Sequence, residues 1–150
     1  MLNVNYIKSI TEKYFPREKV KRKRIMVVDD NVDTLSIIQL ILSRHDFQVI
    51  ISSTASKVYE MKTDFPDLFI IDINLKDADG RDVCVFLKEN PATRDIPVVL
   101  YTGASLDDLK TYNNMCIPDC ILSKPFTIGD LTDTIVRLLT ENKYEFDFKA

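Results

Sequence analysis

Short apolar runs alternate with longer segments of helical spacing from Ile25 onward. The apolar runs are rich in Val, Ile and Phe, and they lie at Ile25–Val28, Phe47–Ile51, Leu68–Ile71, Ile96–Tyr101 and Cys120–Leu122. Short runs with apolar residues at consecutive positions are typical of strands that are covered on both faces. Their starts lie about 20 to 30 residues apart, which leaves room for one strand, one helix and two loops.

The segments between the runs have the capping residues and apolar spacing of helices. Polar residues that can begin these helices are Asn31 or Asp33, Ser56, Ser105 and Thr127. A further helix, with apolar positions Val83, Phe86 and Leu87, is expected to end before Pro91. Because parallel strands are joined by right-handed helical crossovers, five strands that are each followed by a helix predict an α/β fold with a parallel sheet between two helical layers.

Composition narrows the class of protein. The chain of 150 residues is 45% hydrophobic and 29% charged, as expected for one ordinary domain. Its net charge of −3 argues against general nucleic-acid binding. No apolar run approaches the roughly 20 residues of a membrane span, and the N-terminus lacks the basic and apolar regions of a secretory signal. We therefore expect a cytoplasmic protein with no direct contact to nucleic acid or membrane.

Cysteine and histidine offer little for catalysis or metal binding. The three cysteines, Cys84, Cys116 and Cys120, form no CxxC pattern and indicate reduced thiols. A single histidine, His45, excludes a site with several histidine ligands. The chemistry of the chain is therefore expected to depend on carboxylates.

The N-terminal segment is basic, whereas the rest of the chain is acidic. Residues 1–24 carry eight basic and two acidic side chains, and residues 25–150 carry 12 basic and 21 acidic ones. Apolar residues spaced for one face of a short helix precede Pro16, and they are Val4, Ile7, Ile10 and Tyr14. This basic extension, residues 1–23, could dock on a partner or a second copy, or pack on its own domain.

Polar residues follow four of the five predicted strands. Asp29 and Asp30 come after the first apolar run, Asp72 after the third, Thr102 after the fourth and Lys124 after the fifth. Ligands of open α/β sheets bind outside the carboxyl ends of the strands. We therefore expect all five side chains to converge at one edge of the sheet.

The residue types at this edge indicate a phosphoryl and metal site. Three carboxylates in one crevice repel one another unless a hard cation such as Mg²⁺ neutralises them. A hydroxyl and an ammonium beside the cation can hold a phosphoryl group, and an aspartate is a competent nucleophile that forms an acyl phosphate. The chain has only three glycines and no Gly-rich phosphate loop, which disfavours a nucleoside triphosphate as the donor.

Four motifs at these positions resemble the receiver domain of two-component response regulators (CheY-like). They are VVDDN at 27–31, IIDINLKDADG at 70–80, YTG at 101–103 and SKPF at 123–126. The resemblance covers residues 24–141. It implies the flavodoxin-like strand order 2-1-3-4-5 in a doubly wound, three-layer sandwich, with residues 142–150 as a C-terminal tail.

The resemblance also assigns roles to the residues at the strand ends. Asp72 is implied as the phosphoacceptor, and Asp30 as the main acidic Mg²⁺ ligand, with Asp29 acting largely through water. The backbone carbonyl of Asn74 completes the implied protein ligands. Lys124 is expected to contact the phosphoryl group, with a cis peptide bond between it and Pro125. Thr102 is expected to swing toward the phosphoryl group when Asp72 is modified.

Three positions depart from the receiver pattern. Ile121 replaces the aromatic residue that receivers usually place three positions before the lysine. Lys76 stands where a proline is common, and Ile117 where a glycine usually precedes the fifth strand. None of these residues takes part in the phosphorylation chemistry, but coupling of Thr102 to an inward-turning aromatic ring cannot operate in its usual form.

The resemblance predicts a single-domain response regulator that signals through a partner. A sensor histidine kinase or a histidine phosphotransfer protein is the expected donor, and the face formed by helix four, strand five and helix five the expected output surface, with a homodimer as a further form of output. The only reactions expected of the chain are its own aspartyl phosphorylation and dephosphorylation. The first alternative is a degenerate receiver that binds partners without phosphorylation. The second is a haloacid-dehalogenase-like phosphatase, which Asn74 disfavours because those enzymes need an acid at that position.

Overall fold

The computed structural model describes residues 13, 21–105 and 117–147, and of residues 142–147 it describes the backbone only. The helix predicted to begin at Ser105, the helix predicted in residues 1–23 and Cys116 lie outside these residues. Cys84 is buried and Cys120 is half-buried. Within the described part of the chain, no helix is long and apolar enough to cross a membrane.

The core of the fold is a five-stranded sheet in which all paired strands are parallel. The strands are β1 (Arg24–Val28), β2 (Gln48–Ser52), β3 (Leu68–Asp72), β4 (Val98–Thr102) and β5 (Cys120–Ser123). Their order across the sheet is β2-β1-β3-β4-β5, which confirms the flavodoxin-like order. Each strand lies within two residues of the apolar run that predicted it.

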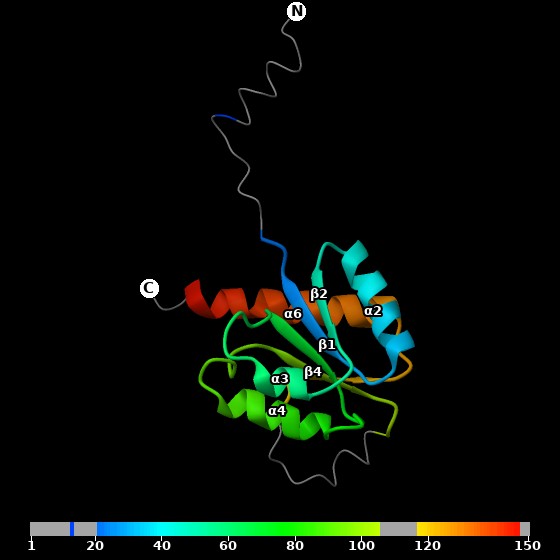
Figure 1. Cartoon of the computed structure of the whole chain (residues 1–150). Helices are drawn as coiled ribbons and strands as arrows, with labels where there is room; N and C mark the ends of the chain where they lie inside the picture. Colours follow the sequence, from blue (N-terminus) through cyan, green and yellow to red (C-terminus); the bar gives the residue numbers. More distant parts are fainter. Residues whose placement is uncertain (1–12, 14–20, 106–116, 148–150) are drawn as a thin grey trace, which may run out of the picture.

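Helices cover both faces of this sheet (Figure 1). The described helices are α2 (Val32–Arg44), α3 (Ser56–Glu60), α4 (Gly80–Glu89) and α6 (Ile128–Asp147). On one face, α2 and α6 bury Leu35 and Leu131 among others against alternate residues of β1, β3 and β4. On the other face, α3 and α4 bury Val58 and Val83 against the remaining strand residues. The three-layer sandwich expected from the sequence is therefore confirmed.

Side chains that accept hydrogen bonds from backbone N–H groups begin the helices. Asn31 accepts from the N–H groups of the first turn of α2, and Thr127 and Asp130 cap each other's N–H groups at α6. At α3 the acceptor comes from elsewhere in the chain, because the Asp77 carboxylate receives the N–H groups of Ala55 and Ser56. Asp77 thereby fastens the loop that follows β3 to the start of α3.

Two expectations from the sequence differ from the structure. The strands β2 and β5 form the edges of the sheet and are only partly buried, although Val49 and Ile51 of β2 pack on one face and Ile50 on the other. The last helix also runs on to Asp147, so residues 142–147 are helical and do not form a tail after it. Few apolar residues lie in this last part of α6, which is why its apolar spacing did not reveal it.

The amino-terminal edge of the sheet is held by a half-buried lysine side chain and the oxygens that accept its hydrogen bonds. Lys88 of α4 donates from Nζ to Asp119 Oδ2 at 2.7 Å and to the carbonyl oxygens of Ile96 and Arg94 at 3.0 and 3.2 Å. The same Asp119 oxygen accepts the N–H of Val98 at 2.8 Å. These contacts join α4 to the starts of β4 and β5.

Gly80 allows α4 to begin directly against the end of β3. Its N–H donates to the carbonyl of Ile73 at 2.8 Å, and a Cβ at this position would lie 2.2 Å from the carbonyl oxygen of Asp72. Any larger residue would therefore displace either the helix or the backbone of Asp72.

We expect Gly80→Ala to lower the free energy of unfolding by about 1–3 kcal/mol, as overpacking of a close backbone contact does. Urea denaturation measures this change. Gly129→Ala is the matched control, because its Cβ would come no nearer than 3.6 Å to Thr127 Oγ1, and it should raise stability by less than about 1 kcal/mol. Equal stability of the two variants would contradict the packing argument.

Candidate functional site

Three carboxylates meet at the carboxyl-terminal edge of the sheet. Asp29 and Asp30 follow β1 and Asp72 ends β3, and one oxygen of each lies within 4.8 Å of the others. The two strands are neighbours, with Val28 in register with Ile71, so the residues that follow them come together. Asp29 and Asp72 are buried, and Asp30 is half-buried. The convergence of these three residues is as the sequence predicted.

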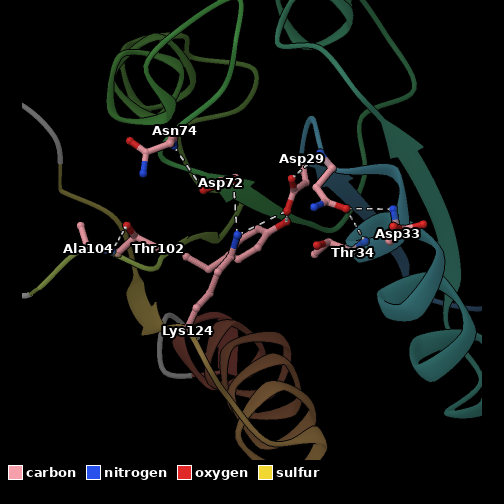
Figure 2. Close-up of polar contacts among 10 residues, drawn as sticks. Asp29, Asp33, Thr34, Asp72, Asn74, Thr102, Ala104 and Lys124 are labelled. Atoms are coloured by element: carbon pink, nitrogen blue, oxygen red, sulfur yellow. Dashed lines mark hydrogen bonds and ion pairs between the residues drawn. The ribbon is translucent and has the colours of Figure 1, made fainter.

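Lys124 extends across this edge from the end of β5 (Figure 2). Its Nζ lies 3.4 Å from Asp72 Oδ2 and 3.5 Å from Asp29 Oδ2, so one ammonium is shared by two carboxylates. The peptide bond between Lys124 and Pro125 is cis, as the family resemblance implied. Lys124 thus joins the acidic cluster as its nearby cation.

Asp72 combines burial with one nearby positive charge. Its Oδ1 accepts the N–H of Asn74 at 3.2 Å, and its Oδ2 faces Lys124. Burial raises the pKa of the Asp72 carboxyl above its ordinary value; the Lys124 ammonium opposes this rise, and the neighbouring Asp29 charge adds to it. The side chain is 8% exposed, so one part of the carboxylate faces solvent while most of it is fixed.

Asp29 is fully buried, and both of its oxygens accept hydrogen bonds. Oδ1 accepts the N–H of Asn31 at 2.8 Å, and Oδ2 accepts the hydroxyl of Tyr101 at 2.5 Å. Together with the Lys124 contact, these donors compensate a charge that would otherwise be costly to bury. Asp29 is therefore the carboxylate of the cluster whose position is most tightly determined.

Thr102 lies at the same edge, but its hydroxyl is engaged elsewhere. Thr102 Oγ1 accepts the N–H of Ala104 at 3.0 Å, and in Figure 2 this pair lies apart from the contacts that link Lys124 with Asp72 and Asp29. The residue is buried and ends β4. Convergence of the five predicted residues at one edge is thus observed, whereas direct contact links only Asp72, Asp29 and Lys124.

Tyr101 is a residue of this site that the sequence reasoning did not identify. It is the residue before Thr102 in β4 and is fully buried. Its hydroxyl contacts Asp29, and the Lys124 Nζ lies 4.3 Å from the centre of its ring. Burial, followed by the hydrogen bond to Asp29, raises the pKa of the phenol above its ordinary value, so it acts as a donor. The available signal was a tyrosine in a wholly buried strand, where a hydroxyl needs a partner.

The donor set of the cluster fits a hard divalent cation. All three acidic side chains offer oxygen ligands, which Mg²⁺ prefers, and Lys124 neutralises only part of their combined charge. Asp29 is fully buried, whereas Asp72 keeps a small exposed fraction and Asp30 is half-buried, so Asp30 and Asp72 are the carboxylates most open to a cation. The arrangement can therefore hold a cation beside an anionic group with several oxygens.

Ile121 lies on the edge strand β5, where receivers usually carry an aromatic residue. It is 40% exposed and pairs with Leu100 of β4. An aliphatic side chain at this place offers no ring to the site. β5 therefore presents an exposed aliphatic side chain at position 121.

Known sequences related to the chain are signalling regulators. The family described as "Response regulator receiver domain" matches residues 25–136. The phosphate regulon transcriptional regulatory protein PhoB of Klebsiella pneumoniae is 28% identical over 114 residues, which are 75% of this chain and 50% of that protein. The response regulator PleD of Caulobacter vibrioides is 35% identical over 81 residues, 53% of this chain and 18% of that protein. The chain thus spans half the length of PhoB and less than a fifth of PleD.

Solved structures share the fold over 79% to 83% of this chain and over 98% of their own length. A CheY-like response regulator receiver domain protein from Methanospirillum hungatei JF-1 has a TM-score of 0.73 at 28% identity, over 83% of this chain and 98% of that one. The receiver domain of a sensor histidine kinase from Pseudomonas aeruginosa PAO1, described with a magnesium ion coordinated in its active-site cleft, has a TM-score of 0.73 at 19% identity, over 79% of this chain and 98% of that one. On the family match and the shared architecture, the chain belongs to the response regulator receiver domain family.

Proposed function

We propose that the chain accepts a phosphoryl group on Asp72 from a phosphohistidine and signals in its phosphorylated form through a protein partner. The observation that carries this proposal is the placement of Asp72 beside a cation, Lys124, and two further carboxylates, at the edge where ligands of such sheets bind. The Asp72 carboxylate is held in place by Asn74 and Lys124, and the 8% of its side chain that stays exposed leaves it open to a donor.

The chemistry requires a nucleophile and charge neutralisation. An Asp72 oxygen attacks the phosphorus, the bond from phosphorus to the histidine nitrogen breaks, and the leaving imidazole keeps the electron pair. The product is an acyl phosphate, which a water molecule later hydrolyses by attack on the same phosphorus. Lys124 neutralises negative charge on the transferred group, because its ammonium already lies 3.4 Å from Asp72.

A divalent cation is the proposed cofactor of this reaction. Asp30, Asp72 and the backbone carbonyl of Asn74 would hold Mg²⁺, with Asp29 acting through water, since both Asp29 oxygens accept hydrogen bonds from the protein. When bound, Mg²⁺ supplies positive charge to the phosphoryl oxygens. The magnesium ion described for the Pseudomonas aeruginosa receiver domain supports this choice of cation.

Phosphorylation is proposed to act on the rest of the domain through Thr102. Its hydroxyl accepts a hydrogen bond from Ala104 N–H and would exchange this contact for the phosphoryl group. The surface proposed to respond includes β5, on which Ile121 is exposed, and α6, while the helix predicted to begin at Ser105 lies outside the described residues. A histidine kinase or phosphotransfer protein is the proposed donor, and a downstream protein or a second copy of the chain is the proposed receptor of the signal.

The proposed receiver unit is residues 24–141. The family match covers residues 25–136, which lie inside these bounds, and this supports them. Residues 1–23 form a basic extension in this proposal, and residues 142–150 follow the unit.

Asp72→Asn should abolish phosphorylation. Incubation of the full chain with Mg²⁺ and phosphoramidate should add the mass of one phosphoryl group to the wild-type chain and none to the variant, because an amide does not form the acyl phosphate. Intact-mass spectrometry measures the gain. Asp95→Asn, which changes an exposed carboxylate in the loop before β4, is the matched control and should be phosphorylated like the wild-type chain.

Other outcomes would point to a different function. A phosphoryl group that survives in Asp72→Asn would refute the assignment of Asp72. No gain with phosphoramidate or with phosphorylated histidine kinases would favour a receiver that acts without phosphorylation. Sustained release of phosphate from many small esters would favour a phosphatase.

The metal-free stability of the chain should depend on pH through Asp72. Because burial raises the folded-state pKa of Asp72, the folded chain binds this proton more tightly than the unfolded chain. The stabilising effect of the proton is present below the ordinary Asp pKa of about 3.9 and is lost as pH rises through the raised value.

Asp72→Asn, which carries no titrating carboxyl, should therefore be more stable than the wild-type chain at pH 7 without Mg²⁺. Thermal unfolding in the presence of a chelator measures the difference, which should shrink as pH falls through the raised pKa of Asp72 and be gone below about 4. Added Mg²⁺ should stabilise the wild-type chain more than the variant, since a bound ligand raises the stability of the folded state. Equal midpoints at pH 7 would show that the carboxylate carries no such cost.

A further inference from the structure

Tyr101 connects the two charged residues that flank Asp72. Its hydroxyl donates to Asp29 Oδ2 at 2.5 Å, and its ring lies beneath the Lys124 ammonium at 4.3 Å. Asp72 and Tyr101 are paired neighbours in β3 and β4, so the tyrosine backbone lies next to that of the proposed phosphoacceptor. A single buried side chain thus contacts both the buried Asp29 carboxylate and the Lys124 ammonium.

The position of the Tyr101 ring is well determined. β4 is hydrogen bonded on both sides, to β3 and β5, and the ring packs edge to face against Phe126 with their centres 6.0 Å apart. The side chain is fully buried in the layer between the sheet and α2 and α6. Its hydroxyl therefore has little freedom to leave Asp29.

Asp29 needs this hydroxyl because burial leaves its charge without water. Its Oδ1 receives the Asn31 N–H, and its Oδ2 faces two donors, the neutral phenol and the Lys124 ammonium. The phenol contact is a short hydrogen bond, whereas the lysine contact is 3.5 Å long. The neutral donor therefore makes the closer contact at Oδ2, and the ammonium remains shared with Asp72 at 3.4 Å.

We propose that Tyr101 is a positioning residue that compensates Asp29 with a neutral donor and so keeps the Lys124 ammonium available to Asp72 and to the phosphoryl group formed there. The stacking of the ammonium on the Tyr101 ring adds to this effect, since a cation is attracted to the face of an aromatic ring. The inference rests on the proposed role of Asp72 and adds to it a residue that acts through Lys124.

Removal of the hydroxyl alone gives the test. In Tyr101→Phe the ring remains, so the core volume and the contact with Phe126 are kept, but Asp29 Oδ2 loses its neutral donor. The Lys124 ammonium is then drawn toward Asp29 and away from Asp72. Phosphorylation of the full chain by phosphoramidate at saturating Mg²⁺ should be slower by about 10- to 100-fold, the range seen when an outer hydrogen-bond partner of a metal or active site is removed.

Two further variants separate positioning from a general loss of structure. Tyr59 lies in α3, and its ring packs on Phe86. Tyr59→Phe removes its hydroxyl and should be phosphorylated at the wild-type rate. In a Lys124→Met background the reaction is slower from the start, and Tyr101→Phe should then change its rate by less than about twofold, because the residue through which Tyr101 acts is gone. Thermal unfolding checks that each variant is folded.

The Lys124 ammonium can also be observed without any reaction. Its ¹⁵N resonance in the unphosphorylated chain should shift in Tyr101→Phe and stay in place in Tyr59→Phe. A wild-type rate or an unmoved Lys124 resonance in Tyr101→Phe would overturn the inference, as would an equal slowing in both the wild-type and the Lys124→Met backgrounds. If the wild-type chain takes up no phosphoryl group, the proposed function fails, and the resonance alone decides whether Tyr101 positions Lys124.

Discussion

Burial of Asp29 and Asp72 beside Asp30 is the constraint on which the charged edge of this domain depends. Two of these carboxylates are withdrawn from water, and buried like charges are stable only where donors or cations compensate them. The neighbouring strand ends supply this compensation through an N–H of the α2 cap, the Tyr101 phenol and the Lys124 ammonium. The strand order makes these contacts possible. β1 lies beside β3, which brings the acids together, and β5 lies beside β4, which places Lys124 over the Tyr101 ring.

The central part of the fold could be predicted from the sequence because buried strands consist mainly of apolar residues at consecutive positions. β1, β3 and β4 are fully or almost fully buried, and their apolar residues stand at consecutive positions. The strand order did not follow from this pattern and came from the resemblance to receivers. Partial exposure of the edge strands β2 and β5 was missed, since short apolar runs look alike at the edge and in the middle of a sheet. The extension of α6 to Asp147 was missed because it has few apolar residues.

The convergence of the charged site residues was predictable, but their detailed contacts were not. A parallel sheet places all its carboxyl ends at one edge, so Asp72, Asp29 and Lys124 could be brought together without knowledge of side-chain geometry. The role of Tyr101 could not be predicted, because a strand residue between apolar neighbours is expected only to fill the core. The contact of its hydroxyl with Asp29 is seen only in the three-dimensional structure. The contact of the Thr102 hydroxyl with Ala104 is likewise a matter of local loop geometry.

The contacts of Lys88 constrain how the edge strand β5 can move. Asp119, immediately before β5, is fastened both to Lys88 and to the first N–H of β4, whereas the far end of β5 leads into Lys124 and the charged site. The far end is also fastened, because the N–H of Lys124 donates to the Thr102 carbonyl at 2.7 Å. β5 is thus held to β4 at both ends, and sliding it along β4 would break the contacts of Asp119 and those beside the charged site together.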